Sequence, residues 1–543
     1  MLGRLIRDLW RRLVPGTANP VPAAAAEPRP ATPTAPVTLG EVEAAIAAWR
    51  DTLGAQPGAR EVRHQLAATL RSLSRLDEAE AVCLEGLSLD AGDTALRHTL
   101  ARVRFAQGRV DEAIADVRAV LARDPAAAAV HSDLISMLNY ADRVAPEDIR
   151  AECARWSDRH AQALTAQAPP PANDPAPERR LRVGYVSPGF REHPVAFFLW
   201  PALEHHDRER FEIILYSDVT HEDEYTGELR GMAEGWRSVV GVSDDALAHA
   251  VREDRIDILV DLSGHTLRNR LLAFARRPAP VQVNWLGFPC TTGLAAMDYR
   301  ITDPWCDPPG LTEALNSETL VRLPHVYMAW RPPLRSPAVA PLPALAAGHI
   351  TFGFFHGCYK ITPRMVALWA RILHGVAGSR LVVLAVDGQT AATRLRDAFA
   401  AHGIAAERLE LLPLLEIDAF LATFARVDIA LDPFPYHGAT TTCFCLWMGL
   451  PVVVLAGTTH ASRADLSLLA NIGLPELATD DADRYVEIAC RLAQQRDELA
   501  ALRARLRGMM LASPVTDGRA HTRELEEAYR GMWRAWCRTR AAG

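Results

Sequence analysis

The sequence predicts an α + α/β protein, in which an N-terminal solenoid of paired helices precedes two Rossmann-like units. Residues 39–165 contain a motif that returns every 34 residues, which indicates the solenoid. From residue 180 onward, short β-branched runs alternate with helical segments, as in parallel, doubly wound sheets. A proline-rich stretch at 332–343 divides these strands into two series. The simplest architecture therefore has two α/β units that face each other across a cleft.

A 34-residue period defines the helical part. The tripeptide Asp-Glu-Ala at 77–79 returns at 111–113, and a leucine returns at the same interval, at positions 66, 100 and 134. A helix–turn–helix unit of this length is the signature of the tetratricopeptide repeat. Each unit buries its apolar face only by stacking on the next one, so we expect one continuous array over 39–165.

Two segments rich in alanine and proline, 15–38 and 166–179, flank the array and are predicted to be linkers. Before the first of them, apolar side chains fall on one helical face among four arginines. Such a helix could make peripheral contact with an anionic membrane or a partner, or it could be a frayed tail, because a short helix is marginal alone. Residues 1–38 are therefore predicted as an amphipathic helix followed by a disordered linker.

The α/β region contains two sets of predicted strands. Those of the N-terminal unit, 180–335, are Arg182–Val186, Phe211–Tyr216, Ile256–Asp261, Val281–Trp285 and Tyr299–Thr302. Those of the C-terminal unit, 345–515, are Ile350–Phe354, Leu381–Val386, Leu409–Leu412, Asp428–Leu431 and Pro451–Leu455. Runs of this kind are typical of buried parallel strands. The last segment, 516–543, is predicted as a helix that packs back onto the body.

The overall composition excludes several classes of protein. A net charge of −7 and an isoelectric point near 6.2 give no basic footprint for nucleic acid. No apolar run reaches the roughly 18–20 residues of a membrane span, and the arginine-rich N-terminus is a poor signal peptide. The nine cysteines are dispersed without a CxxC pair. This pattern argues against a disulfide framework or structural zinc and favours a reducing cytoplasm.

The most informative segment is 431–463, LDPFPYHGATTTCFCLWMGLPVVVLAGTTHASR. Its first turn delivers the three threonines of 440–442 to the start of a predicted helix. Free N–H groups, the helix dipole and three hydroxyls at this position suit a phosphate. The second turn, at 457–460, repeats the arrangement one strand later. Two such turns at one sheet edge predict a nucleotide diphosphate site, although ordinary helix capping could also explain the threonines.

Three further residues follow predicted strands, at the edge where such folds bind ligands. His193 and His265 each come after a strand of the first series, and Lys360 stands at the start of a helix in the second. A neutral imidazole could accept a proton near pH 7 or hydrogen-bond an acceptor hydroxyl. A lysine ammonium suits a departing diphosphate. Each residue alone could instead be a capping, loop or solvated side chain, so the prediction depends on their convergence.

The sequence predicts no metal site. No group of His, Cys and Asp has the spacing of metal ligands. The acidic pair Asp481 and Asp483 is interpreted as helix capping, and Cys443 and Cys445 as small core residues. We therefore expect no cofactor.

Several blocks, in this order behind a tetratricopeptide array, resemble one known family. They are GYVSPGFREHPV, DLSGHT with RRPAPVQVNWLGFPCTTGLAAMDYRITD, LDPFPYHGATTTCFCLWMGLPVVVLAG, and HASR. The family is that of the protein O-linked N-acetylglucosamine transferases and SPINDLY-type proteins, here in its bacterial branch. The resemblance covers about 182–540 together with the repeats. It implies a GT-B fold and an inverting, metal-independent transfer, usually from UDP-N-acetylglucosamine to Ser or Thr of a protein, or to Asn in one bacterial branch.

The resemblance also implies roles for individual residues. Lys360 matches the lysine at the donor diphosphate, while His193 and His265 match two active-site histidines. The donor-binding turns match at His437, Gly438, Thr440, Thr441, Thr442, Thr459 and His460. The loop at the cleft entrance matches at Gly287, Pro289 and Thr291. The attacking oxygen would displace the diphosphate directly, and its proton could pass to His193, His265 or a donor phosphate oxygen.

Departures from the family pattern leave the donor and acceptor open. His356-Gly357 replaces a polar amide before Lys360, and Ala439 stands where the animal enzymes have a histidine. Because SPINDLY-type relatives use GDP-fucose, a different nucleotide sugar is an alternative. A non-protein acceptor and an inactive scaffold are further alternatives. Grooves of tetratricopeptide arrays usually hold peptides, so a protein or peptide acceptor in that groove is the expected partner.

Overall fold

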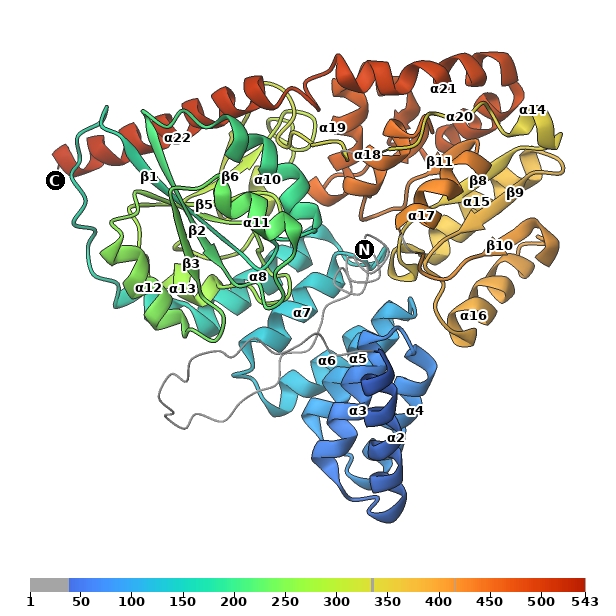
Figure 1. The fold of residues 1–543 in the computed structure, drawn as a ribbon, viewed down its shortest axis with the longest axis horizontal. Helices are drawn as coiled ribbons and strands as arrows, with labels where there is room; N and C mark the ends of the chain where they lie inside the picture. The colour runs from blue at the N-terminus through green and yellow to red at the C-terminus, as the bar shows by residue number, and fades with distance from the viewer. Residues whose placement is uncertain (1–38, 334–335, 416, 543) are drawn as a thin grey trace.

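The computed structural model describes residues 39–333, 336–415 and 417–542. The amphipathic helix and linker predicted for 1–38 lie outside these residues. Figure 1 shows a helical array below two α/β lobes that lie side by side, with the C-terminal helices running along their top. The predicted fold class, a solenoid followed by two Rossmann-like lobes in a GT-B arrangement, is confirmed.

The array is built from consecutive helices joined by short turns. They are α2 (Leu39–Ala55), α3 (Arg60–Ser72), α4 (Leu76–Leu89), α5 (Thr94–Ala106), α6 (Val110–Arg123), α7 (Ala128–Leu138), α8 (Pro146–His160) and α9 (Gln162–Ala166). Leu66, Leu100 and Leu134, which occupy the same place in successive repeats, are all buried. The 34-residue period therefore marks the face on which neighbouring helices pack.

The first lobe contains a parallel sheet in the order β3-β2-β1-β4-β5-β6-β7. Its strands are β1 (Leu181–Ser187), β2 (Phe211–Ser217), β3 (Gly235–Ser238), β4 (Ile258–Asp261), β5 (Val281–Asn284), β6 (Tyr299–Thr302) and β7 (Thr319–Arg322). Its helices are α10 (Pro194–His205), α11 (Glu224–Gly231), α12 (Asp244–Glu253) and α13 (Leu271–Ala275). Val186 pairs with Asp261 and Ser187 with Ser217, so these strands end at one edge. Every predicted strand is present, and β3 and β7 are additional.

The second lobe contains a sheet in the order β10-β9-β8-β11-β12-β13. Its strands are β8 (Thr351–Phe354), β9 (Arg380–Val383), β10 (Leu409–Leu411), β11 (Ile429–Leu431), β12 (Val452–Leu455) and β13 (Ala478–Thr479). Its helices are α14 (Ala344–Ala347), α15 (Pro363–Gly375), α16 (Gln389–Ala400), α17 (Ile417–Thr423), α18 (Thr440–Trp447), α19 (Ala464–Asn471), α20 (Ala482–Gln494) and α21 (Arg496–Leu511). The five predicted strands are present, and β13 is additional.

The last helix, α22 (Gly518–Ala542), returns from the second lobe to the first. The Tyr529 hydroxyl lies 3.2 Å from that of Tyr185 on β1, and the Glu526 carboxylate lies 3.0 Å from His206 Nδ1. Trp533 of this helix is fully buried. The two lobes are therefore connected by a helix as well as by the 332–343 segment.

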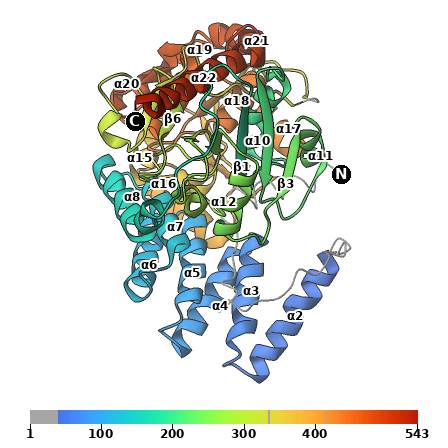
Figure 2. The same ribbon diagram turned by 90° about the vertical axis from the view of Figure 1, so that its left-hand side faces the viewer.

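The array contacts both lobes, and Figure 2 shows it below them from the side of the first lobe. On the first lobe, the Thr165 hydroxyl donates to the carbonyl of Ala275 at 2.9 Å. On the second lobe, the backbone N–H of Gln389 donates to the Asp77 carboxylate at 2.7 Å. Asp77 therefore supplies the first turn of α16 with an acceptor from the array, because the N-cap residue Gly388 has no side chain to do so.

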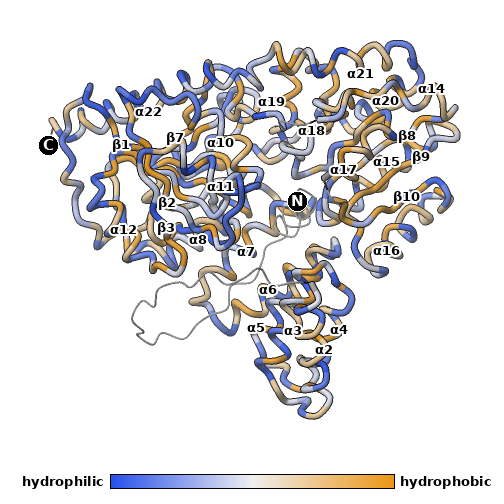
Figure 3. Tube along the Cα trace, in the orientation of Figure 1, coloured by the Kyte–Doolittle hydropathy of each residue, from blue (hydrophilic) through white to orange (hydrophobic). Residues whose placement is uncertain are grey.

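Apolar residues follow the strands of both lobes, and polar residues follow their outer helices (Figure 3). One contiguous core of buried residues extends through both lobes and includes α22. Among the described residues, no helix combines the length and the apolar content that crossing a membrane requires. The contiguous core of both lobes therefore supports the strand ends.

Candidate active site

A cavity of about 280 Å³ lies where the two lobes and the array meet. The first lobe contributes the turns after β1 and β4 and the loop after β5. The second lobe contributes the segment around Lys360 and the turn that leads into α18. The array contributes Phe105, Asp133, Ser136 and Tyr140. A ligand in this cavity would therefore contact all three parts of the protein.

Lys360 lies on the second-lobe side of this cavity. It ends the short 3-10 helix η2 (Cys358–Lys360), which follows β8. Its Nζ donates to the carbonyl of His437 at 2.6 Å and lies 4.6 Å from the ring centre of Tyr436. Burial lowers the pKa of Lys360 to about 8, against the opposing effect of nearby carboxylates. The ammonium is thus a partly desolvated cation that an incoming anion would stabilise.

Lys360 is also the single lysine in the 543-residue sequence. Every other position that carries a permanent positive side chain is an arginine. Lysine presents a compact point charge, whereas arginine presents a planar fork, so the two are not equivalent. The use of lysine at this one position is therefore a sequence signal for the site, and motif spacing does not contain it.

The turn into α18 is held by a carboxylate of the neighbouring helix. Asp465 accepts hydrogen bonds from the backbone N–H groups of Gly438 and Ala439, at 3.0 and 2.8 Å, and from the Thr442 hydroxyl. Ala439 adopts a left-handed conformation, with φ of 49°. The first N–H groups of a helix have no intrahelical acceptor, so those of Thr440 and the next residue can serve a ligand.

The three threonines of this turn separate into two groups. Thr440 and Thr441 line the cavity, and their contact with the donor stays a prediction. Thr442 is buried and donates to Asp465, and it is absent from the lining. A turn of helix directs successive side chains to different sides, so Thr442 supports the turn through Asp465, and its contact with a ligand stays a prediction.

His437 is held by the backbone on both sides of its ring. Its Nε2 donates to the Leu455 carbonyl at 3.0 Å, and its Nδ1 accepts the N–H of Asp465 at 3.2 Å. His437 and Gly438 both line the cavity, and their contact with the donor stays a prediction. Since both ring nitrogens are engaged, the imidazole fixes the geometry of the turn.

Asp432, His437 and Asp465 bring ligand-type atoms within 4.8 Å of one another, a cluster that sequence spacing did not reveal. Neither nitrogen of His437 keeps a lone pair for a cation, given the two bonds just described. Burial and the neighbouring Asp465 raise the pKa of Asp432 well above its usual range. The arrangement therefore fits a pair of carboxyl groups that share a proton, and it does not fit a metal site.

The second turn of the predicted donor site has a different role. Thr459 caps the short helix η5 (His460–Ser462) and is bonded to Ser462 in both directions. His460 lies 2.6 Å from the Asp307 carboxylate of the first lobe. Burial alone would raise the pKa of Asp307, but His460 holds it below its usual range. Neither Thr459 nor His460 lines the cavity, and the structure places them at a joint between the lobes; their contact with the donor phosphates stays a prediction.

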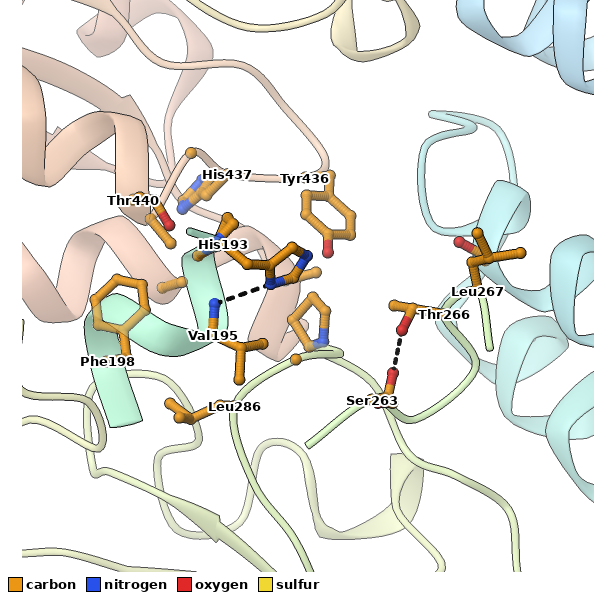
Figure 4. A pocket seen from close by; sticks show the side chains of 18 of the residues that line it. His193, Val195, Phe198, Ser263, Thr266, Leu267, Leu286, Tyr436, His437 and Thr440 are labelled. Carbon is orange, nitrogen blue, oxygen red and sulfur yellow. Dashed lines mark hydrogen bonds between the residues drawn. The ribbon is translucent and has the colours of Figure 1, made fainter. Parts of the chain in front are cut away.

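His193 lies in the middle of the cavity, between the second-lobe residues His437 and Tyr436 and the first-lobe residue Leu286 (Figure 4). It is the N-cap residue of α10, and its Nδ1 accepts the N–H of Val195 at 3.2 Å. In a neutral imidazole the proton then resides on Nε2, which is a donor. This geometry favours His193 as a hydrogen-bond donor to a ligand over its use as a proton acceptor.

His265 is not in the cavity lining, although an active-site position was expected. It is fully buried, with Nδ1 3.0 Å from the Ser132 hydroxyl of α7 and Nε2 donating to the Thr292 carbonyl at 2.8 Å. Its ring packs edge-on against Trp156 of α8. Burial lowers its pKa to about 3. The structure therefore places His265 at the joint between the array and the first lobe, and its expected role in the reaction stays a prediction.

The cleft-entrance loop contributes two of its three predicted residues. Gly287 and Pro289 line the cavity, whereas Thr291 is buried and donates to Glu318 at 2.6 Å. A Cβ atom at Gly287 would lie 1.9 Å from the carbonyl oxygen of Leu262. Only glycine fits this close approach, so the loop is held against the turn after β4.

Sequence reasoning missed an aromatic cluster that joins the array to the donor side. Phe105 stacks on Tyr359 with ring centres 4.8 Å apart, and Tyr140 stacks on Tyr436 at 4.3 Å. Tyr359 precedes Lys360 in the chain, and Tyr436 precedes His437. The position of these two tyrosines beside predicted site residues was a sequence signal for their part in the site. Their partners on the array could not be predicted without the fold.

The comparison with known proteins gives one family. The sequence profile described as glycosyl transferase family 41 matches residues 129–330 and 341–525. These ranges include the last part of the array and both lobes, and they contain all the residues of the cavity except Phe105. The match therefore extends over the site as well as the fold.

Individual relatives agree with this match. The "Probable UDP-N-acetylglucosamine--peptide N-acetylglucosaminyltransferase SPINDLY" of Solanum lycopersicum is 42% identical over 372 residues, which is 67% of this chain and 40% of the relative. The protein of the same name from Oryza sativa subsp. japonica is 40% identical over 421 residues, or 76% and 45%. The chain thus spans less than half the length of these relatives.

A solved structure matches over nearly its whole length. It is a mutant O-GlcNAc transferase from Thermobaculum terrenum, with a TM-score of 0.87 and 39% sequence identity. The match covers 92% of this chain and 95% of the other. The array and both lobes therefore occur together in another protein with this arrangement.

Proposed function

Because the chain belongs to glycosyl transferase family 41, we propose that it is an inverting, metal-independent protein glycosyltransferase. The proposed reaction moves N-acetylglucosamine from UDP-N-acetylglucosamine to a Ser or Thr hydroxyl. The names of the SPINDLY relatives support this donor and a peptide acceptor. The observation that carries the proposal is the Lys360 ammonium, which lies beside the start of α18 in a cavity shared by both lobes and the array.

The donor diphosphate would bind between Lys360 and the first turn of α18. Its negative charge would complement the buried ammonium, and the N–H groups and hydroxyls of Thr440 and Thr441 would donate to its oxygens. Charge grows on the diphosphate as it leaves, so these fixed donors stabilise the transition state more than the ground state. No metal ion is needed for this charge balance, and EDTA is expected to leave transfer unchanged.

The acceptor oxygen would attack the anomeric carbon from the side opposite the diphosphate. A new C–O bond forms as the bond to the phosphate oxygen breaks, which inverts the anomeric centre. His193 would donate from Nε2 to the sugar or the acceptor and so hold the reacting groups in position. Because His265 lies outside the cavity lining, the proton of the acceptor hydroxyl would pass to a phosphate oxygen of the donor.

The array forms the acceptor side of the proposed site. Phe105, Ser136 and Tyr140 reach the cavity from helices α5 and α7 and the turn after α7. A peptide that lies along these helices would bring its hydroxyl directly to the reacting carbon. The arrangement of the two lobes and the array around one cavity therefore favours a protein acceptor over a small-molecule acceptor.

The proposal is tested by nucleotide binding and by sugar transfer. Thermal shifts with UDP, GDP and CMP would identify the nucleotide, because a ligand that binds the native state raises the melting temperature. We expect a shift with UDP that is lost in Lys360→Met. The matched control is Arg364→Ala, which removes an exposed cation on α15 outside the cavity and should keep the shift.

Transfer is then measured with UDP-N-acetylglucosamine labelled in the sugar and a panel of Ser/Thr peptides. Labelled peptide with the wild type and none with Lys360→Met would support the proposal. A shift with GDP alone would indicate that the donor is a guanine nucleotide sugar. This is the alternative that follows from Ala439 and His356, where the sequence departs from the family pattern. No shift with any nucleotide would contradict an enzymatic role and favour a scaffold.

A further inference from the structure

Two cysteines meet where the array contacts the cleft-entrance loop. Cys153 lies on α8, and Cys290 lies in the loop after β5, between the cavity-lining Pro289 and the buried Thr291. The Cys153 Sγ lies 3.5 Å from the carbonyl oxygen of Thr291, the residue that follows Cys290. The two thiols are close enough for each to shift the pKa of the other, so they lie next to each other at the joint.

The backbones of the two segments are also in close contact. A Cβ atom at Gly293 would lie 2.5 Å from the carbonyl oxygen of Cys153 and 2.7 Å from its Cβ. The absence of a side chain at Gly293 thus lets the loop approach α8 closely. A disulfide needs its two Cβ atoms about 4 Å apart and suitably oriented, which requires such backbone proximity.

The two thiols differ in exposure and in reactivity. Cys290 is half-buried, whereas Cys153 is fully buried. The hydrogen bond from Cys153 lowers the pKa of the Cys290 thiol, and the Arg300 guanidinium, which donates to the carbonyl of Cys290, acts in the same direction. The thiolate is the reactive form of cysteine, so Cys290 is the group that an oxidant would meet first.

We propose that Cys153 and Cys290 form a reversible disulfide site that ties the cleft-entrance loop to the array when a peroxide oxidises the protein. The Cys290 thiolate attacks one peroxide oxygen, which gives a sulfenic acid and hydroxide. The Cys153 sulfur then attacks the Cys290 sulfur and displaces hydroxide, and its proton ends on the water that forms. In total, two thiols and one hydrogen peroxide give one disulfide and two waters, and a thiol reductant reverses the change.

The bond would act on one wall of the cavity. Gly287 and Pro289 stand in the same loop as Cys290 and line the cavity, and α8 belongs to the array. Oxidation would therefore hold the loop and the array in one relative position. This inference concerns the joint itself and does not depend on the proposed transferase activity.

The test is a peptide map of the full chain after brief treatment with hydrogen peroxide. Trypsin separates the two cysteines into the peptides 151–155 and 277–300, each of which contains a single cysteine. We expect a disulfide-linked pair of these peptides and the loss of two of the nine thiols in a denaturing thiol titration. Dithiothreitol should restore both. Hydrogen–deuterium exchange of 286–293 should slow in the oxidised form.

Single serine variants identify the two cysteines that form the disulfide. Cys153→Ser and Cys290→Ser should each abolish the linked peptides, while Cys490→Ser, the matched change at the other half-buried cysteine, should leave them unchanged. The proposal is overturned if the wild type keeps all nine thiols, or if Cys290 is oxidised to a sulfinic or sulfonic acid without any linked peptide. The wild-type map alone decides this, whether or not the serine variants fold.

Discussion

The ring of Tyr140, in the turn after α7 of the array, stacks on the ring of Tyr436, in the turn before α18, with centres 4.3 Å apart and planes at 9°. The same Tyr436 ring lies 4.6 Å from the Lys360 ammonium. An aromatic face attracts a nearby cation through its quadrupole. Tyr436 therefore links the array to the residue that we assign to the donor diphosphate, and this link connects the acceptor side of the cavity to the donor side.

Removal of the Tyr436 ring should weaken nucleotide binding. A cation–π contact at a desolvated site contributes about 2 kcal/mol, so Tyr436→Leu is expected to raise the dissociation constant for UDP by about 30-fold. Tyr436→Phe keeps the aromatic face and should stay within about threefold of the wild type. Isothermal titration calorimetry with UDP measures both. Equal losses in the two variants would show that the hydroxyl, and not the ring face, matters.

Substitution of Ser132 should separate a structural from a catalytic role of His265. Ser132→Ala leaves the Nδ1 atom of His265 buried without its partner at 3.0 Å, which should lower the free energy of unfolding by about 1–3 kcal/mol. UDP affinity should not change, because neither residue lines the cavity. Urea unfolding and calorimetry measure the two effects. The control Ser88→Ala, an exposed serine of α4, should change stability by about 0.5 kcal/mol or less. A fall in turnover at unchanged stability would restore the active-site role of His265.

A side chain at Gly287 should disturb the cleft-entrance loop. Gly287→Ala forces the backbone away from Leu262, where a Cβ would lie 1.9 Å from the carbonyl oxygen. We expect a loss of about 3 kcal/mol in unfolding free energy together with weaker UDP binding. The control is Gly227→Ala on α11, where a Cβ meets no atom within 4 Å and alanine favours the helix by about 1 kcal/mol. Similar stabilities of the two variants would contradict the close approach.

Most of the strands that sequence patterns predicted consist largely of buried residues, and the exception, β10, is a half-buried edge strand that contains Leu409 and Leu411. Central strands such as β1 and β4 consist of continuous apolar runs, so their composition is diagnostic. The strands β3, β7 and β13 were missed because they lie at sheet edges, are short and expose part of each residue. An edge strand owes its conformation to its neighbour more than to its own composition.

The site was predictable where the topology alone decides position. Lys360, His193 and Gly438 gather in one cavity because they follow the ends of parallel strands in facing sheets. The direction of a side chain within a turn is a different matter. The side chain of His265 lies against Ser132 of the array, and that of His460 lies against Asp307 of the other lobe, so neither lines the cavity. Those partners are more than 130 residues distant in the chain, so no local pattern announces them.

The central claim is that the Lys360 ammonium meets the donor diphosphate, and one NMR titration tests it directly. Protein grown with [ε-¹³C]lysine gives a single lysine signal, because the sequence contains one lysine. We expect its titration midpoint near pH 8 in the free protein, where burial lowers the pKa, and an upward move on addition of UDP, because the diphosphate favours the charged form. UDP affinity should correspondingly fall as the pH rises above 8. A midpoint near the ordinary value of 10.5 that UDP leaves unchanged would contradict the account.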